Sequence, residues 1–191
     1  TYGLRRSMFY GVDQGLKDYL FQGAPQDCAW IGDIFPLTTN AEELVPVRFG
    51  RQDFLVGFSS PLYAAGNSDE LLNTLSESDA DGFDFHPSAR LVKFTRLEAT
   101  SSNQYNPEAW NLDKAEQIYQ FSQTLGQAVV AHAEALSACQ QYFFWATNER
   151  LELLYKRTFR YIDRTCLPGE FEPILEKTGV LNGYQRTQNH Q

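Results

Sequence analysis

The sequence predicts a single α+β domain with a mixed or mainly antiparallel sheet of five to six strands, packed by one long helix and carboxyl-terminal helices. Three observations favour this fold class. Short segments rich in β-branched and aromatic residues fill the first half of the chain, a long segment with apolar residues at helical spacing occupies the second half, and no linker or internal repeat separates them. With 191 residues, 42% of them apolar, the chain is long enough to close one hydrophobic core. We expect the domain to span residues 1–184 and residues 185–191 to form a flexible tail.

Strand signals dominate the first half of the chain. The clearest is a hairpin, because two runs of β-branched and aromatic residues at 45–49 and 54–58 flank a connection at 50–53. Residues 90–97 alternate between two sets of side chains, which indicates a further strand. The other elements expected here are strands at 2–10 and 29–37, helices at 13–22 and 67–75, and an acidic loop at 76–84.

Helix signals dominate the second half. Asn106 can cap a helix and Pro107 fits its first turn, while Asp113 offers a second start. From there apolar residues recur at helical spacing to about Cys139, so we expect at least one long amphipathic helix.

Three further elements are expected after this helix. The run YFFWA at 142–146 is short and apolar, which favours a buried strand. Asn148 can cap a following helix that carries Leu151, Leu154 and Tyr155 on one face. A final short helix is expected to begin near Pro173 and to end at Gly179.

Cysteine usage and hydropathy favour a cytoplasmic protein. Cys28, Cys139 and Cys166 are odd in number and widely spaced, which fits neither a disulfide framework nor a zinc site. No stretch approaches the roughly 20 apolar residues of a membrane span, and the amino terminus lacks the pattern of a signal peptide. We therefore expect no membrane association.

The negative charge is concentrated in the first part of the chain. Residues 1–84 contain 13 Asp and Glu against 5 Lys and Arg, whereas residues 85–191 contain 11 of each, which together give the net charge of −8. An acidic surface repels phosphate backbones and attracts basic proteins, so nucleic acid is not an expected ligand.

The acidic loop supplies candidate partner-binding residues, because aromatic anchors among acidic side chains suit the capture of a basic protein. We therefore predict an acidic protein-interaction module of the inhibitor or immunity type, with no cofactor. A metal site is not expected, because the loop lacks the glycine and glutamate positions of a calcium loop and offers no third ligand beside Asp84 and His86. The candidates for the protein interface are Asp79, Asp81, Phe83, Asp84 and Phe85.

A second hypothesis comes from residues 123–159. The pattern Q-x-x-G-x-A at 123–128 precedes the run YFFWAT, and NERLELLY follows from Asn148. In this order the segment resembles the carboxyl-terminal half of the GCN5-related N-acetyltransferases (GNAT), which have a Q/R-x-x-G-x-G/A loop at a helix start, then a strand, then a helix written roughly N-x-x-A-x-x-L-Y.

The resemblance implies an acyltransferase that uses acetyl-CoA or another acyl-CoA. In that case Gln123, Gly126, Ala128 and Asn148 would bind the cofactor, with backbone N–H groups of the loop turned toward the pyrophosphate. Tyr155 would be the general acid that protonates the departing thiolate. For each of these residues the alternative is a purely structural role in helix packing or capping.

Two other features of the second half allow both a structural and a functional interpretation. His132 lies on the apolar face of the long helix, where a lone histidine is more often a hydrogen-bonded core residue than a ligand. Lys156, Arg160 and Arg164 recur every four residues beside Arg157. Such a basic stripe can bind a phosphate or an acidic partner helix, or it is the solvated face of the helix.

Overall fold

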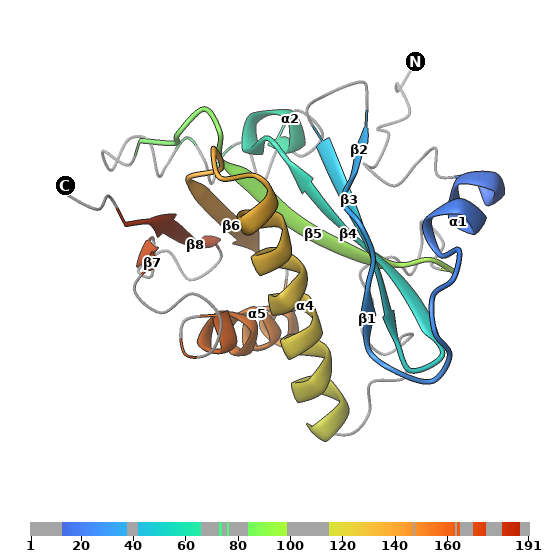
Figure 1. The fold of residues 1–191 in the computed structure, drawn as a ribbon. Coiled ribbons are helices and arrows are strands. Elements are labelled where there is room, and N and C mark those ends of the chain that lie inside the picture. The colour runs from blue at the N-terminus through green and yellow to red at the C-terminus, as the bar shows by residue number, and fades with distance from the viewer. Residues whose placement is uncertain are drawn as a thin grey trace, which may run out of the picture.

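An eight-stranded sheet forms the centre of the described part of the molecule (Figure 1). The computed structural model describes residues 13–37, 42–65, 73, 76, 84–98, 115–146, 148–162, 164, 170–174 and 181–187. The strands are β1 (Trp30–Ile31), β2 (Phe35–Leu37), β3 (Glu42–Phe49), β4 (Gln52–Ser59), β5 (Arg90–Arg96), β6 (Gln141–Trp145), β7 (Phe171–Ile174) and β8 (Leu181–Arg186). The helices are α1 (Gln14–Leu20), α2 (Pro61–Ala65), α4 (Ala115–Ala135) and α5 (Glu149–Tyr161).

The strand order is β1-β3-β4-β5-β6-β8-β7, and β2 also pairs with β3. β5 and β6 are parallel, and the other strand pairs in the described residues are antiparallel. A parallel pair needs a crossover connection, and α4 belongs to the one that joins β5 to β6. The centre of the fold is therefore a strand–helix–strand unit set between two antiparallel regions.

The β3–β4 hairpin is confirmed, with bounds wider than the sequence predicted. Its register runs from Glu43 opposite Phe58 to Phe49 opposite Gln52. Gly50 closes the turn with a φ of +61°, in the left-handed region that glycine adopts without strain.

Next to the turn, the Arg48 guanidinium donates two hydrogen bonds to the Asp53 carboxylate, at 2.6 and 2.9 Å. It also donates a hydrogen bond of 2.8 Å to the Ala24 carbonyl, which ties the segment after α1 to the hairpin.

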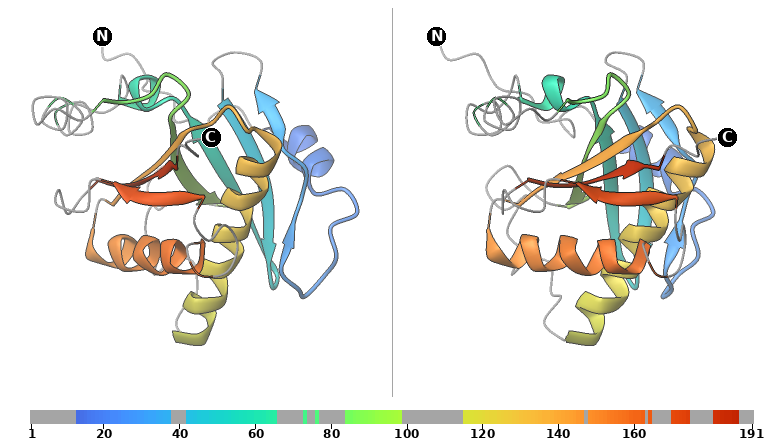
Figure 2. Two further views of the ribbon diagram at one scale, coloured as in Figure 1. Left: turned by 60° about the vertical axis from the view of Figure 1, so that its left-hand side comes forward. Right: turned by 90° about the vertical axis from the view of Figure 1, so that its left-hand side faces the viewer.

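The main core lies between one face of the sheet and the two long helices. Figure 2 shows α4 and α5 on the same side of the strands. Burial of apolar side chains on this scale is the main force that holds such a layer together. The largest contributors, all 2% exposed or less, are Phe54, Phe58, Phe94, Phe121, Tyr142 and Phe144. A smaller cluster on the opposite face contains Ala64 of α2 together with Leu91, Phe143 and Leu181.

α4 and α5 approach each other closely at Gly126. A Cβ atom built on Gly126 would lie 2.8 Å from Cδ1 of Tyr161 and 3.5 Å from the Thr158 carbonyl oxygen. The glycine therefore lets two helices cross at short range. Asn148 caps α5 as predicted, because its side-chain oxygen accepts a hydrogen bond from the Leu151 N–H at 3.0 Å.

The α+β class is confirmed, but several details of the predicted fold are wrong. The sheet has eight strands instead of five to six. The described helices are four, because α1 lies at the helix expected at 13–22 and the unpredicted α2 is added to the long helix α4 and the Asn-capped helix α5. The expected strand at 29–37 is two short strands, β1 and β2. Pro173 lies in β7 instead of opening a helix, because this segment forms a sheet edge beside β8.

The predicted tail is also wrong for its first residues. Gln185 and Arg186 belong to β8, and the Thr187 N–H donates a hydrogen bond of 2.8 Å to the Glu170 carbonyl. The expected strand at 2–10, helix start at 106–108 and last residues of the tail, 188–191, lie outside the described residues, as does most of the expected helix at 67–75.

Candidate functional site

The predicted cofactor loop at 123–128 does not exist. Gln123, Gly126 and Ala128 lie inside α4, which is one continuous helix from Ala115 to Ala135. Backbone N–H groups inside an α-helix are hydrogen-bonded to carbonyls one turn earlier, so they cannot face a pyrophosphate. Gly126 faces α5 and Ala128 is fully buried. The prediction that these residues form an anion-binding loop is therefore wrong.

Of the other two residues implied by the resemblance, Asn148 caps α5 and Tyr155 lies within it. The Asn148 side chain is occupied as the helix cap. Tyr155 is 4% exposed, and its ring lies 6.0 Å from that of Phe94 in β5 and 4.8 Å from that of Phe144 in β6, measured between centroids. Tyr155 thus packs between these two strands on the helix face of the sheet.

Of the acidic loop expected at 76–84, the structure describes residues 76 and 84. Asp79, Asp81 and Phe83, the other partner-binding candidates of that loop, lie outside the described residues. Asp84 is exposed, and its carbonyl accepts a hydrogen bond of 3.2 Å from the Gln141 side chain. Phe85 packs on Phe143, with ring centroids 5.0 Å apart. Phe85 therefore belongs in part to the smaller core.

A buried polar network joins four elements on the helix face. The Arg90 guanidinium of β5 donates two hydrogen bonds to Glu43 of β3, at 2.9 and 3.0 Å. His132 of α4 lies with Nε2 3.3 Å from Oε2 of Glu43 and Nδ1 2.8 Å from the Tyr142 hydroxyl of β6. The ring of Phe58 stacks on the His132 imidazole at 3.8 Å. His132 is therefore a hydrogen-bonded core residue, as its position in the sequence predicts.

The network holds His132 neutral and Glu43 ionised. Burial lowers the pKa of His132 and outweighs its hydrogen bond to the Glu43 carboxylate, which acts to raise that pKa. Burial acts to raise the pKa of Glu43, but hydrogen bonds from His132 and Arg90 outweigh it and keep that pKa below its ordinary value. A neutral imidazole can donate from Nε2 to Glu43 and accept at Nδ1 from Tyr142, so each group has a partner.

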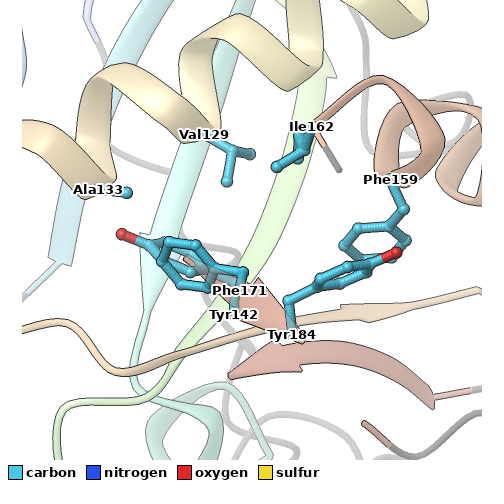
Figure 3. A pocket seen from close by; sticks show the side chains of 7 residues that line it. All are labelled: Val129, Ala133, Tyr142, Phe159, Ile162, Phe171 and Tyr184. Carbon is cyan, nitrogen blue, oxygen red and sulfur yellow. The ribbon is translucent and has the colours of Figure 1, made fainter. Parts of the chain in front are cut away.

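A narrow apolar cavity lies next to this network (Figure 3). It has room for about one water molecule, roughly 10 Å³, and Val129 and Ala133 of α4 face Tyr142, Phe171 and Tyr184 across it. The cavity has no polar lining, and the Tyr142 hydroxyl is hydrogen-bonded to His132. The arrangement is that of a packed, satisfied core.

A second polar group lies on the opposite face of the sheet. The strand register places Leu44, Gly57 and Lys93 in one row across β3, β4 and β5. Side chains two residues apart on a strand share a face, so Glu42 and Ser59 lie in the next row on the same side as Lys93. Because Gly57 has no side chain, Lys93 and Glu42 face each other across β4.

This second group differs from the first in its hydrogen bonds and its ionisation. Glu42 is 5% exposed and Ser59 is 1% exposed, and Oε1 of Glu42 and Oγ of Ser59 have no hydrogen-bond partner among the described residues. Burial raises the pKa of Glu42 and lowers the pKa of Lys93. Buried polar atoms without partners are rare, and such ionisable groups cluster at functional sites.

β5 and β6 are paired near the start of β5 and separate further along the two strands. Their parallel pairing consists of Arg90 with Tyr142 and Leu91 with Phe143. The rest of β5 continues along β4, while the rest of β6 continues along β8. Lys93 therefore lies two residues beyond the last paired position, on the face opposite Tyr155. This separation, with Lys93 and Glu42 on one face and Tyr155 on the other, is the candidate site.

Comparison with known proteins gives no assignment. No family model, no curated protein and no solved structure matches the chain. No helix among the described residues has the length and apolar character needed to cross a membrane. Within the same residues, no cluster of three or more His, Cys, Asp and Glu side chains is arranged to hold a metal ion.

Sequence reasoning missed Glu42, Glu43, Arg90 and Lys93. One signal could have pointed to them: two adjacent carboxylates open the apolar run Leu-Val-Pro-Val, so both must be buried if that run is a central strand. A buried carboxylate needs a partner, and Arg90 and Lys93 are cations of the strand that follows the hairpin along the chain.

Proposed function

We propose that the chain is an acyl-CoA-dependent acyltransferase of the GNAT type, with its site where β5 and β6 separate. The observation that carries this proposal is a parallel strand pair, joined through α4, whose pairing ends at Leu91 and Phe143. In open sheets, ligands bind outside the carboxyl ends of parallel strands, where neighbouring connections diverge. The order of helix, strand and Asn-capped helix in α4, β6 and α5 is also the order that the resemblance implies, without its loop at the helix start.

The residues around this separation suit acyl transfer to an amine. Acyl-CoA would supply an activated thioester. The protein must then accept a proton from the attacking amine and provide one for the departing sulfur. Lys93 suits the first task, because burial lowers its pKa and so increases the share of neutral amine that can accept a proton. Tyr155 packs between Phe94 and Phe144 on the other face of the sheet. We assign it the second task, which is to protonate the departing sulfur. We assign no residue to phosphate binding, because the predicted loop at 123–128 is helical.

A thermal-shift measurement tests cofactor binding. A ligand that binds the native state alone at a concentration 100 times its Kd adds about 2.7 kcal/mol of stability. For a chain of this size that corresponds to a rise in Tm of roughly 5–10 °C. We expect such a rise with 1 mM acetyl-CoA and not with 1 mM acetate. An unchanged Tm with both compounds would remove the proposal.

A second experiment tests the chemical roles. Thiol release from acetyl-CoA is followed in the presence of a panel of primary amines, for the wild-type chain and for Lys93→Met, Tyr155→Phe and the exposed control Glu134→Gln. We expect at least about a tenfold loss of rate for the first two variants, because general acid or base groups contribute roughly 10²–10⁴. The acetyl-CoA shift in Tm should persist in all three. Equal rates in all variants would contradict the assigned roles.

Capture of a basic protein partner by the acidic loop stays a prediction. Of its five candidate residues the structure describes Asp84, which is exposed, and Phe85, which packs on Phe143. A pull-down from the native host at 50 and 300 mM salt tests it, because association steered by charge weakens as salt rises. Recovery of one basic partner at low salt, without any effect of acetyl-CoA on Tm, would favour this function over acyl transfer.

A further inference from the structure

A groove lies between α5 and the β7–β8 hairpin, away from the separation of β5 and β6. Its volume is about 350 Å³, within the range of pockets that hold small organic ligands. Lys156 and Arg160 line one side, and Pro173 and Ile174 of β7 line the other.

The groove also has an aromatic lining. The rings of Phe159 and Tyr184 stack with centroids 4.2 Å apart and an angle of 28° between their planes. Both residues line the groove. Phe159 is 4% exposed, so the half-buried ring of Tyr184, backed by Phe159, and Ile174 offer the apolar surface against which a planar ring can pack.

The charge of the groove is positive. Lys156 and Arg160 are one helical turn apart, and among the described residues that line the groove none is acidic. Lys156 forms an ion pair with Glu152 of the same helix at 2.5 Å. The Arg160 side chain is exposed, and no hydrogen bond or ion pair joins its guanidinium to another described residue. A cation in the last turn of a helix is favoured by the helix dipole, but this does not account for the aromatic surface beside it.

These features select one class of ligand. Because Glu152 compensates Lys156, Arg160 is left as the uncompensated cation, which suits a ligand with a single negative charge. The planar guanidinium binds a carboxylate through two parallel hydrogen bonds. We propose that the groove binds a small aromatic monocarboxylate, with the carboxylate on Arg160 and the ring against Phe159 and Tyr184. This inference does not depend on the proposed acyltransferase function.

Isothermal titration calorimetry with indole-3-acetate tests the proposal. We expect a Kd of about 1 mM or lower for the wild-type chain. Indole has the ring without the charge, and acetate has the charge without the ring, so each should bind at least about tenfold more weakly. Arg160→Gln should weaken indole-3-acetate by about tenfold. Arg157→Gln removes the same charge from an exposed position of α5 that does not line the groove, and should change the Kd less than twofold.

Three outcomes would overturn the proposal. They are no binding of indole-3-acetate at 5 mM, equal affinity for indole and indole-3-acetate, or equal weakening by the two arginine variants. Both arginines are exposed, so folding of the variants is checked by comparing their Tm with that of the wild-type chain. Arg160→Lys keeps the positive charge but loses the two parallel N–H donors of the guanidinium. We expect this variant to bind indole-3-acetate with intermediate affinity.

Discussion

Replacement of Glu43 by glutamine is the sharpest test of the buried network. The substitution keeps the shape of the side chain and removes its charge, so that Arg90 loses its ionised partner. Their side chains are 12% and 15% exposed, and the two hydrogen bonds between them measure 2.9 and 3.0 Å. The same change replaces the carboxylate oxygen that lies 3.3 Å from Nε2 of His132.

The expected loss of stability follows from this geometry. Removing one partner of a fully buried ion pair costs about 3–5 kcal/mol. The pair of Glu43 and Arg90 retains some solvent contact, and the glutamine amide oxygen still accepts one hydrogen bond. We therefore expect a loss of about 2–4 kcal/mol, or roughly 5–15 °C in Tm for a chain of this size. Glu134→Gln, an exposed change of the same kind in α4, should change stability by less than about 0.5 kcal/mol.

The same variant should change the dependence of stability on pH. Glu43 has a lowered pKa in the native state, so its contribution is present above its unfolded pKa, near 4.5, and is lost as the pH falls through its native pKa. His132 is held neutral, so the unfolded state gains a proton first as the pH falls below about 6.5, and stability falls there too. Glu43→Gln removes the carboxylate that acts to raise the pKa of His132, so chemical denaturation between pH 7 and pH 5 should show a loss of stability in the variant at least as large as in the wild-type chain.

A double-mutant cycle tests whether the interaction between Glu43 and Arg90 stabilises the fold. Glu43→Met, Arg90→Met and the double variant form a cycle whose coupling free energy should exceed about 1 kcal/mol, because the two residues share a contact. Strictly additive single and double losses, or a cost below about 1 kcal/mol for Glu43→Gln, would show that the network does not stabilise the fold.

Two further predictions concern α1, α4 and α5. Gly126→Ala should destabilise the chain by about 1 kcal/mol in urea denaturation, because the added Cβ meets the Tyr161 ring at 2.8 Å. Gly15→Ala should stabilise the chain by about 0.5 kcal/mol, because the added Cβ makes an ordinary contact there. If Gly126→Ala were the more stable of the two variants, the close crossing of α4 and α5 would be contradicted. Asn148→Ala should cost about 1 kcal/mol through the lost hydrogen bond to the Leu151 N–H, and Asn148→Asp should not. If Asn148→Asp alone abolished an acetyl-CoA shift in Tm, Asn148 would be more than a cap.

Local patterns allowed part of the fold to be predicted. The β3–β4 hairpin and the cap of α5 are encoded by neighbouring residues, and both were identified. Helical periodicity predicted a long helix through Gly126, whereas the family resemblance implied a loop there; the glycine instead allows α5 to pack closely on α4. β7 was misread because Pro173 is typical of a helix start, and what makes it a strand is its pairing with β8.

The candidate site depends on contacts between distant parts of the chain. Glu43 and His132 are 89 residues apart, and Glu43 and Arg90 are 47 apart. Their partnership follows from the strand order and from the position of α4, neither of which a local pattern specifies. Lys93 and Glu42 are likewise neighbours only because β4 presents Gly57 between them.

The sequence of β3 also affects whether this strand pairs with its neighbours in the correct register when the chain folds. Its residues from Glu42 to Val47 are buried on both faces, and they read as two carboxylates followed by four apolar positions. A slip of the strand by one residue would still present a carboxylate and apolar side chains to each layer, so burial alone discriminates poorly against that misalignment. The left-handed Gly50 and the clamp of Arg48 on Asp53 therefore have to select the correct alignment, and damage to this turn should produce a mixture of mispaired hairpins.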